Sequence, residues 1–458
     1  MSMSEQPIRE RTPEPPAIQE GFVTLLLGIS VVLVIMNTMM FNLALPDVSV
    51  SFDLSASLTS WIVTGYSIVF AISSITYSRL SDFVPIRRLF IIATLSFSIA
   101  AIAGYFSDSF LWLLIVRIVQ ASGAGAIPAL SMVFISRYVP VERRGKAMAT
   151  IMSAASLGLG LGPVAGGAIV EVLGWHYLFV VTAITLLLVP FYAKLIPTEK
   201  STKGSFDALG AILVGIGTTS LLLFLTNQTW IALVAGIAAI ILFVIRIRTA
   251  SEPFVQPALF RNRPYLALAA VGIAAYICSF ATLFLMPQIL VKQSGLSAIG
   301  AGLVIFPGSL LAMLLSRRVG RMIDLRGNRS IIRNVPFLLL ASVVLFAVFS
   351  GTTYLAILFI YMLLSIGFTF LTSSVSNEMS RILDKSQIGS GLGLFQLLQF
   401  FSGAFGVAVT ASALGWQKQF SLAHAYSNIY WGMTFVVLAS IACGYAYLRS
   451  SSKIAHAA

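Results

Sequence analysis

Residues 22–45 read FVTLLLGISVVLVIMNTMMFNLAL and contain no charged side chain. A helix needs about 20 mostly apolar residues to cross the hydrocarbon core of a bilayer, so this stretch predicts a membrane-spanning helix. The rest of the chain has the same character, because 58% of its 458 residues are hydrophobic and only 10% are charged. Soluble domains carry about 25% charged residues. The composition therefore excludes a soluble enzyme and a disordered chain.

Similar apolar runs recur along the chain and predict an all-α integral membrane protein with fourteen transmembrane helices. The predicted spans are 22–45, 58–80, 88–107, 110–136, 146–171, 175–196, 207–226, 230–248, 265–290, 299–317, 331–350, 354–377, 387–413 and 426–448. Residues 1–21 are polar, with four prolines and four glutamates, and they lack the short apolar core and cleavage site of a signal peptide. We expect them to be a disordered cytoplasmic tail.

The positive charges fix the expected direction of the spans. The odd-numbered connections contain only Lys292 and Lys418, and Arg117 lies inside a span; the other Lys and Arg residues fall in the tails and the even-numbered connections. Since Lys and Arg stay on the cytoplasmic side during insertion, both termini are expected in the cytoplasm. The formal net charge of +13 then reflects topology, and no nucleic-acid partner is expected.

Catalytic and metal-binding patterns do not occur in the sequence. The two cysteines, Cys278 and Cys443, lie in separate apolar runs, and the three histidines are scattered. Neither residue type has the spacing of a metal site or a disulfide framework. There is also no buried acid pair and no Gly-x-Ser-x-Gly elbow. We therefore expect no enzyme activity, no metal and no cofactor.

Two cytoplasmic connections resemble each other. Residues 77–88 read YSRLSDFVPIRR and residues 320–329 read GRMIDLRGNR, so each places an aspartate, Asp82 or Asp324, among arginines. The simplest explanation is that both are basic loops that obey the positive-inside rule. The alternative is an internal repeat of two six-helix halves, which would place a substrate site near the midplane between them.

Two motifs lie within the predicted membrane helices. Residues 158–167 read GLGLGPVAGG, in which Gly158, Gly162 and Gly166 recur every four residues, Pro163 bends the helix and Gly167 completes the string. Such a stripe of small residues lets helices approach closely. Residues 117–125 read RIVQASGAG and place Arg117 and Gln120 on one helix face. An arginine within a span marks a functional site by default, although it could also be a structural residue bonded to backbone carbonyls.

These features resemble the major facilitator superfamily. The Asp82 loop resembles the family's loop after helix two, residues 158–167 its antiporter motif, and residues 117–125 its helix-four motif, in which the arginine is linked to proton transfer. Further stretches are similar to fourteen-helix drug:proton antiporters, closest to the tetracycline efflux proteins of Gram-positive bacteria. These stretches are Leu45-Pro46-Asp47, Arg144-Gly145-Lys146-Ala147, Gly204-Ser205-Phe206-Asp207, Pro253-Phe254-Val255 and Phe306-Pro307-Gly308.

The resemblance implies a domain organisation and a mechanism. It implies six-helix bundles at 22–196 and 261–449, two inserted helices at 197–260, and a cytoplasmic tail at 450–458. The two bundles would rock about a central site and export a drug in exchange for protons, so that antibiotic resistance would follow. The cytoplasmic gate would involve Asp82, Arg87, Arg88, Asp324 and Arg326. The protein would work as a monomer in a bacterial plasma membrane, with a small-molecule substrate and the lipid bilayer as its partners.

The sequence departs from the tetracycline exporters at the acids that those proteins carry on helices one, five and thirteen. The corresponding positions are Asn37, Leu159 and Gly403. A proton-coupled antiporter needs a group that changes protonation, usually a buried carboxylate, and arginine cannot serve because it stays charged. Only Asp47, Glu171 and Glu378 touch span ends.

Three interpretations follow. One of these acids titrates; or the substrate carries the proton or is an anion attracted to Arg117; or the protein moves lipid-like compounds, or is a facilitator, without proton coupling. A non-transporting membrane sensor is the alternative of another class, but no connection is long enough to fold as an output domain.

Polar residues on the helices that usually face the cavity are the candidates for the substrate and proton pathway. They are Asn37, Asn42, Tyr66, Arg117, Gln120, Tyr276, Gln288, Gln396 and Gln399. Aromatic neighbours such as Phe280 and Phe400 suit an amphipathic ligand. Any single polar residue of this set could instead form an interhelical hydrogen bond, worth about 0.6 kcal/mol.

Overall fold

The computed structural model describes residues 20–457 apart from 55, 200, 202–205, 252, 385–386 and 418. The described residues form helices throughout. In the N-terminal half these are α1 (Glu20–Ser51), α2 (Ala56–Leu80), α3 (Ile86–Tyr105), α4 (Phe110–Ala124), α5 (Ala126–Tyr138), α6 (Val141–Leu173), α7 (Tyr177–Ala183) and α8 (Val189–Leu195). In the rest of the chain they are α9 (Ala208–Asn227), α10 (Trp230–Thr249), α11 (Ala258–Arg261), α12 (Arg263–Gln288), α13 (Ala298–Arg326), α14 (Asn328–Phe349), α15 (Tyr354–Ile382), α16 (Ile388–Trp416) and α17 (Leu422–Ala457).

The prediction of an all-helical membrane protein is confirmed, but the count of fourteen spans is not. Twelve described helices are long and apolar enough to cross a membrane. A further pair, Ile299–Leu315 and Arg318–Leu325 within α13, bends by 42°, and the apolar part of α9 is shorter, at Ala208–Phe224. The number of membrane spans therefore depends on whether α9 and the bent α13 each cross the bilayer.

Several boundaries differ from their predictions because helices continue past the apolar runs. Residues 1–19 lie outside the described part of the chain, but Glu20 and Gly21 begin α1, where Glu20 pairs with Arg143 at 3.0 Å. The expected tail therefore ends before residue 20. At the other end, α17 continues through Ala457, so residues 450–457 are helical. The predicted span 110–136 is divided at Gly125, where a Cβ atom would overlap the backbone of Phe70.

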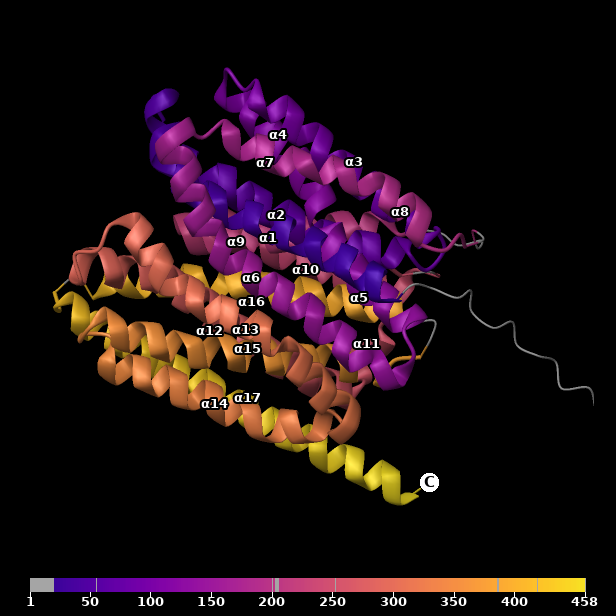
Figure 1. The fold of residues 1–458 in the computed structure, drawn as a ribbon. Coiled ribbons are helices and arrows are strands. Elements are labelled where there is room, and N and C mark those ends of the chain that lie inside the picture. The colour runs from indigo at the N-terminus through magenta and orange to yellow at the C-terminus, as the bar shows by residue number, and fades with distance from the viewer. Residues whose placement is uncertain are drawn as a thin grey trace, which may run out of the picture.

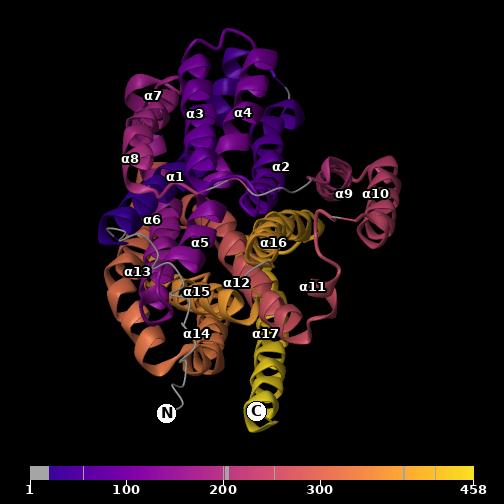
Figure 2. The same cartoon turned by 90° about the vertical axis from the view of Figure 1, so that its right-hand side faces the viewer.

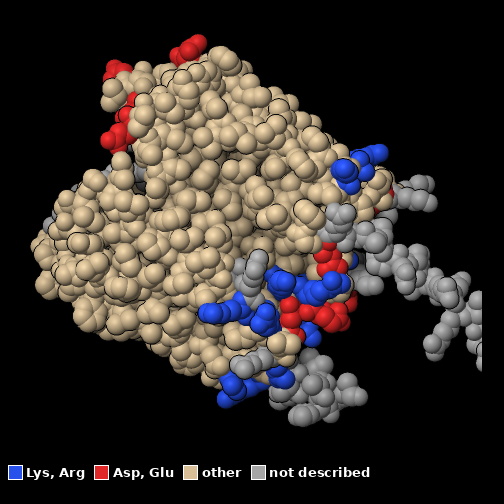
Figure 3. All heavy atoms as spheres, in the orientation of Figure 1, with Lys and Arg blue, Asp and Glu red and all other residues tan. Residues whose placement is uncertain are grey.

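The helices pack as two groups that meet along two seams. In Figure 1 the helices of the first half, α1 to α8, lie above those of the second, α12 to α17. Across the boundary, α6 packs along α13 and α2 packs along α16. The ribbons of the two groups converge where the Lys and Arg side chains gather (Figures 1 and 3), which we call the basic end of the molecule, and diverge towards the opposite end.

The hairpin of α9 and α10 stands outside both groups, beside α16 and α2 (Figure 2). The two short motifs that flank it in the sequence meet in space. The Asp207 carboxylate accepts from the Gly210 and Phe254 backbone N–H groups at 3.0 and 3.2 Å and from the Arg246 Nε at 3.1 Å. The Phe206 ring packs edge-on against Phe254. Asp207 thus joins the start of α9 to the end of α10 and to Phe254 that follows it. The sequence motifs around Asp207 and Phe254 therefore form one structural unit.

Candidate transport pathway

Arg117 lies at the centre of the first group and is completely buried. Its Nη1 donates to the Asn37 Oδ1 at 3.0 Å and to the Gln120 Oε1 at 2.6 Å. Its guanidinium lies over the rings of Phe41 and Tyr66, 3.9 Å from each centroid. The Asn37 amide is itself oriented, because its Nδ2 donates to Thr182 at 2.6 Å. The structure thus brings together four of the predicted site residues, Asn37, Tyr66, Arg117 and Gln120.

No described Asp or Glu pairs with Arg117. Desolvated cation–π contacts contribute about 2 kcal/mol each, and hydrogen bonds to a charged group about 1.5–3 kcal/mol. These interactions offset the cost of burying an ion, which is several kcal/mol, but they add no negative charge. The Nε and Nη2 atoms have no hydrogen-bond partner among the described residues. Arg117 therefore keeps a net positive charge inside the bundle.

Aromatic rings connect Arg117 to the second group of helices. Tyr66 and Phe70 are successive rings on α2, with centroids 6.2 Å apart. Phe70 packs edge-on against Phe400 of α16 at 4.6 Å, and Phe400 packs against Tyr276 of α12 at 5.6 Å. The Phe70–Phe400 contact crosses between the two halves. We call the rings of Tyr66, Phe70, Phe400 and Tyr276 the aromatic bridge; Phe41 and Phe70 were not predicted from the sequence.

The other predicted pathway residues have different environments. Tyr276, Gln396 and Gln399 are buried on α12 and α16, and neither amide atom of Gln399 has a partner among the described residues. Gln288 donates to the Phe284 carbonyl of its own helix at 3.3 Å, which is a local structural bond. The side chain of Asn42 lies outside the described part of the structure.

The glycine stripe of the predicted antiporter motif packs against α1. Cβ atoms at Gly158, Gly162 and Gly166 would all overlap or press on α1, for example at 2.9 Å from the Val32 carbonyl and 2.8 Å from the Met40 Cα. Pro163 lies within α6, and Gly167 is half-buried. Close backbone contact on both sides of Asn37 holds α1 in place, so that Asn37 and Phe41 contact Arg117 of α4.

Each position that lacks an acid has become part of the packing. Asn37 contacts Arg117 through its neutral amide. Leu159 is 5% exposed and belongs to the hydrophobic core. At Gly403, a Cβ atom would lie 2.9 Å from the ring of Phe280, so this ring occupies the space of a side chain. The environments of Leu159 and Gly403 are apolar, whereas position 37 faces a guanidinium but carries a neutral amide.

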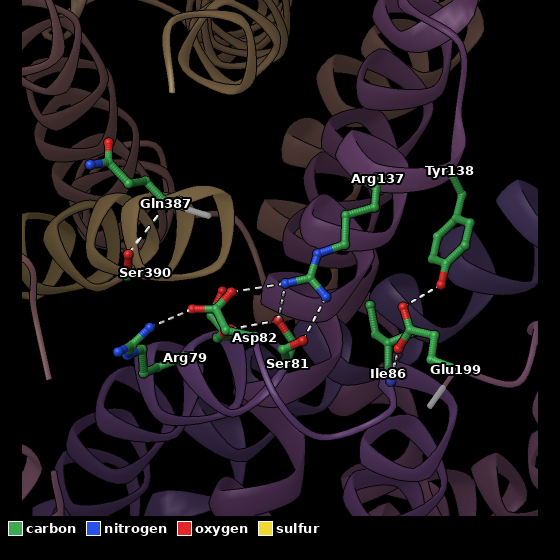
Figure 4. Close-up of polar contacts among 10 residues, drawn as sticks. Arg79, Ser81, Asp82, Ile86, Arg137, Tyr138, Glu199, Gln387 and Ser390 are labelled. Atoms are coloured by element: carbon green, nitrogen blue, oxygen red, sulfur yellow. Dashed lines mark hydrogen bonds and ion pairs between the residues drawn. The ribbon is translucent and has the colours of Figure 1, made fainter. Parts of the chain in front are cut away.

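The first aspartate of the repeated connections bridges the two halves at the basic end (Figure 4). Asp82 forms ion pairs with Arg79 at 2.8 Å and with Arg137 at 2.9 Å. It also accepts from the backbone N–H of Gly389, the second residue of α16, where the helix dipole favours a negative group. Burial raises the pKa of the Asp82 carboxyl above its ordinary value, and the hydrogen bond from Arg79 and the charge of Arg137 oppose that rise.

Arg87 and Arg88 were predicted with Asp82 as gate residues, and the ion pairs found for Asp82 are with Arg79 and Arg137. Arg87 donates to the Thr198 hydroxyl at 2.9 Å within the first half, and Arg88 is exposed. Both follow Pro85, in the first turn of α3. Arg137 ends the predicted helix-four segment, but no feature of the sequence pairs it with Asp82.

The second aspartate forms the corresponding contact on the other seam. The Asp324 carboxylate on α13 accepts from the backbone N–H groups of Gly145 and Lys146, at 2.9 and 3.3 Å, near the start of α6. A Cβ atom at Gly320 would overlap the backbone of Lys146. Each repeated loop therefore places its aspartate against a helix of the other half. The side chain of Arg326 lies outside the described part of the structure.

Only one of the three acids proposed to titrate is buried. Asp47 and Glu171 are exposed. Glu378 on α15 is 8% exposed and accepts from the Tyr447 hydroxyl and the Asn328 Nδ2, both at 2.5 Å, with Arg381 at 3.4 Å. These partners all belong to the second half, at the basic end. The searched part of the chain, which is the described residues, holds no group of three His, Cys, Asp or Glu side chains that suits a metal.

This arrangement defines a class of protein: a helical membrane transporter with two packed halves, polar and aromatic side chains between them, and matching contacts that close one end. The chain belongs to the Major Facilitator Superfamily, whose family description matches residues 27–407.

Relatives in bacteria and two solved structures agree with this assignment. The riboflavin transporter RibZ of Clostridioides difficile is 26% identical over 453 residues, which cover 95% of this chain and 99% of RibZ. The lincomycin resistance protein LmrB of Listeria monocytogenes is 28% identical over 388 residues, covering 81% of this chain and 82% of LmrB.

Among solved structures, the human organic anion transporter MFSD10 has a TM-score of 0.68 at 16% identity and covers 93% of this chain and 100% of its own. The proton:xylose symporter XylE has a TM-score of 0.67 at 16% identity, with coverages of 92% and 94%. At this identity the likeness concerns the fold alone.

Proposed function

We propose that this protein exports amphipathic, drug-like small molecules across a bacterial plasma membrane by alternating access. The observation that carries the proposal is the pair of contacts at the basic end, in which Asp82 accepts from Gly389 of α16 and Asp324 of α13 accepts from Gly145 of α6. They join the two halves below a central set of polar and aromatic side chains, so breaking them would open that set to the other side. Binding sites between repeated halves, near the midplane, are typical of transporters of this kind.

The positive-inside rule places the basic end in the cytoplasm. Both termini then lie there, which requires an even number of crossings. If α9 and the bent α13 each cross the membrane, the total is fourteen. The moving bodies would be residues 22–196 and 261–449, with 197–260 inserted between them. Since one chain contains both halves, a monomer suffices.

Drug:proton antiport with a tetracycline-like substrate is the more specific function that the resemblance to the family implies. It requires a group that takes up and releases protons. Among Asp47, Glu171 and Glu378, Glu378 supports this role best because it alone is buried. Glu378 lies at the basic end, among partners of the second half only, and not beside the central residues. This position argues against proton exchange at Arg117 through Glu378.

An exporter of an anionic or lipid-like compound without carboxylate-based coupling is the second candidate. The observation that favours it is Arg117, a buried charge with no described carboxylate partner. A non-transporting sensor has no such observation in its favour.

Cellular accumulation tests the export function. The protein is expressed in a bacterium that lacks its main efflux systems, and intracellular tetracycline, lincomycin and riboflavin are measured against a Gly320→Val strain. This substitution would insert a side chain into the backbone of Lys146. We expect the wild type to lower the level of at least one compound, and Gly320→Val to abolish the difference. Levels that rise with the wild type would show import and contradict the proposal.

A further inference from the structure

The central site contains a positive charge that the protein itself does not balance. Arg117 is completely buried, and its partners Asn37 and Gln120 are neutral amides. Its Nε and Nη2, together with the Nε2 of Gln120, are buried N–H groups without partners among the described residues. Buried polar groups are nearly always hydrogen-bonded. This cluster of N–H donors therefore suits an acceptor that carries negative charge and that the chain does not supply.

The aromatic bridge indicates the shape of the ligand that bears this negatively charged group. The rings run from Arg117 across the seam between the halves, through Tyr66, Phe70 and Phe400. When the halves rock, the Phe70–Phe400 contact must change, which leaves ring faces for a ligand to pack against. Rings prefer to pack edge-to-face or offset against other rings. Gln399, whose amide atoms have no partner among the described residues, lies on the same helix as Phe400 and offers hydrogen bonds at the far end.

The described acids lie at or near helix ends or in connections, and none forms an ion pair with Arg117. These acids are Glu20, Asp47, Asp53, Asp82, Asp108, Glu142, Glu171, Glu199, Asp207, Asp324, Glu378 and Asp384. On α1, for instance, Asp47 is ten residues beyond Asn37, or about 15 Å at 1.5 Å per residue. No described carboxylate is therefore placed to exchange a proton for a substrate at Arg117.

We propose that the transported substrates are planar aromatic anions, bound through Arg117 and the aromatic bridge, and that the membrane potential rather than a proton gradient drives their export. This inference rests on the proposed export function and names its substrate class. The inside-negative potential of a bacterial cell pushes a monoanion outward, and each 59 mV or so corresponds to a tenfold concentration ratio for a single charge. A uniporter for such anions needs no titrating group, which fits a site whose acids are replaced by Asn37, Leu159 and Gly403.

Two probes with the same ring and fixed, opposite charges test the inference. Naphthalene-2-sulfonate is an anion and trimethyl(2-naphthyl)ammonium a cation at any pH of interest. The protein is reconstituted in vesicles of phosphatidylethanolamine and phosphatidylglycerol. Valinomycin with a potassium gradient sets an interior-positive potential without a pH difference; a second set has a pH gradient and no potential. Protein-free vesicles give the leak.

We expect the sulfonate to accumulate about tenfold per 59 mV, with no accumulation under the pH gradient alone and no potential-driven movement of the ammonium probe by the protein. Two results would overturn the inference and leave export intact: preferential transport of the ammonium probe, or sulfonate transport that requires the pH gradient. If neither probe moves under either gradient, the inference fails, and the cellular accumulation of tetracycline, lincomycin and riboflavin then decides whether the proposed export function stands.

Asn37→Asp adds the missing carboxylate next to the guanidinium at nearly constant volume. We expect it to lower sulfonate flux at least tenfold and to raise ammonium flux. Asn37→Ser removes the amide without adding charge and serves as the matched control, in which the preference for the anion should persist. Loss of the preference in Asn37→Ser would show that the charge of Arg117 does not determine it.

Discussion

Arg117 and Arg137 are close in sequence and occur on consecutive helices, α4 and α5, but their charges have different surroundings. Arg137 donates to the Asp82 carboxylate and to the carbonyl and hydroxyl oxygens of Ser81. Arg117 has two amide oxygens and two aromatic rings. At the basic end one carboxylate thus lies between two guanidinium groups of its own half, those of Arg79 and Arg137, and meets the other half through the Gly389 backbone N–H, a contact that can form and break as the halves move. The central site holds a permanent, unbalanced charge.

This difference separates two functions within one bundle. A contact that must open in every cycle benefits from partners that water can replace, and Asp82 lies in a connection at the membrane surface. A binding site benefits from a charge that only the substrate neutralises, because the interaction is then gained on binding rather than shared with the protein. Electrostatic interactions are strongest where water is excluded, as at Arg117.

We expect the largest effect from a substitution that prevents α6 and α13 from approaching each other at the basic end. Gly320→Val would force a side chain into the backbone of Lys146, and overpacking costs about 1–3 kcal/mol, a roughly 5- to 150-fold shift in the equilibrium. We expect the two halves to separate at this end. The separation is measured by double electron–electron resonance between spin labels at Arg88→Cys and Arg321→Cys. Cys278 and Cys443 are replaced by Ala in this protein.

Gly432→Val is the matched control, because nothing lies within 4 Å of a Cβ atom at Gly432. Its distance distribution should match that of the parent protein. If Gly320→Val leaves the distance unchanged as well, α6 and α13 do not depend on this close approach.

The next prediction compares the two arginines directly. Arg137→Gln leaves the half-buried Asp82 carboxylate with one fewer partner, at a cost of about 1–2 kcal/mol; we expect thermal stability in detergent to fall. Arg117→Gln removes an unbalanced charge and keeps an amide donor, so we expect stability to stay level or rise while substrate binding is lost. Binding-site residues commonly show this exchange of stability for function.

A thermal melt and a binding isotherm for each variant measure both effects. Asp82→Asn combined with Arg137→Gln should recover part of the lost stability, because the carboxylate charge is then absent. A fall in stability for Arg117→Gln as large as that for Arg137→Gln would remove the distinction between the two sites.

A third arginine pair sharpens the comparison, because it lies outside the proposed gate. Asp207→Asn should weaken the bond to Arg246 and the attachment of the α9–α10 hairpin, at a cost of about 1–2 kcal/mol. We expect lower thermal stability but no change in the Arg88–Arg321 label distance. A shift in that distance would mean that the hairpin takes part in opening the basic end.

The smallest effect is the pH dependence of the closed basic end. Burial raises the pKa of Asp82 in the closed arrangement, so the closed state binds a proton more tightly than an open state in which Asp82 is hydrated. Closure should therefore be favoured as the pH falls through the shifted pKa and be lost gradually as the pH rises above it. The label distance recorded from pH 7 to pH 4 measures this, and Asp82→Asn should abolish the dependence.

Much of the fold was predictable because hydrophobic run length and the distribution of Lys and Arg are strong signals in membrane proteins. The span count was less secure, since α9 is short and α13 bends by 42°, and run length does not reveal bends. Arg117 and Gln120 were predictable from helical spacing.

The partners of the gate aspartate were not predictable from sequence. Arg137 reaches Asp82 only through the packing of α5 on α2, and the Gly389 contact joins residues that are more than 300 positions apart. Phe41 and Phe70 are ordinary apolar residues in a chain that has 32 phenylalanines, so only the packing identifies them.

The most direct test of the unbalanced charge at Arg117 is the charge selectivity of Asn37→Asp. Binding of naphthalene-2-sulfonate and trimethyl(2-naphthyl)ammonium is measured by equilibrium dialysis in purified wild type and variant. The wild type should bind the anion at least tenfold more tightly than the cation, and Asn37→Asp should reverse or abolish that preference. Equal affinity of the wild type for both probes, or an anion preference that survives Asn37→Asp, would contradict this account of the central site.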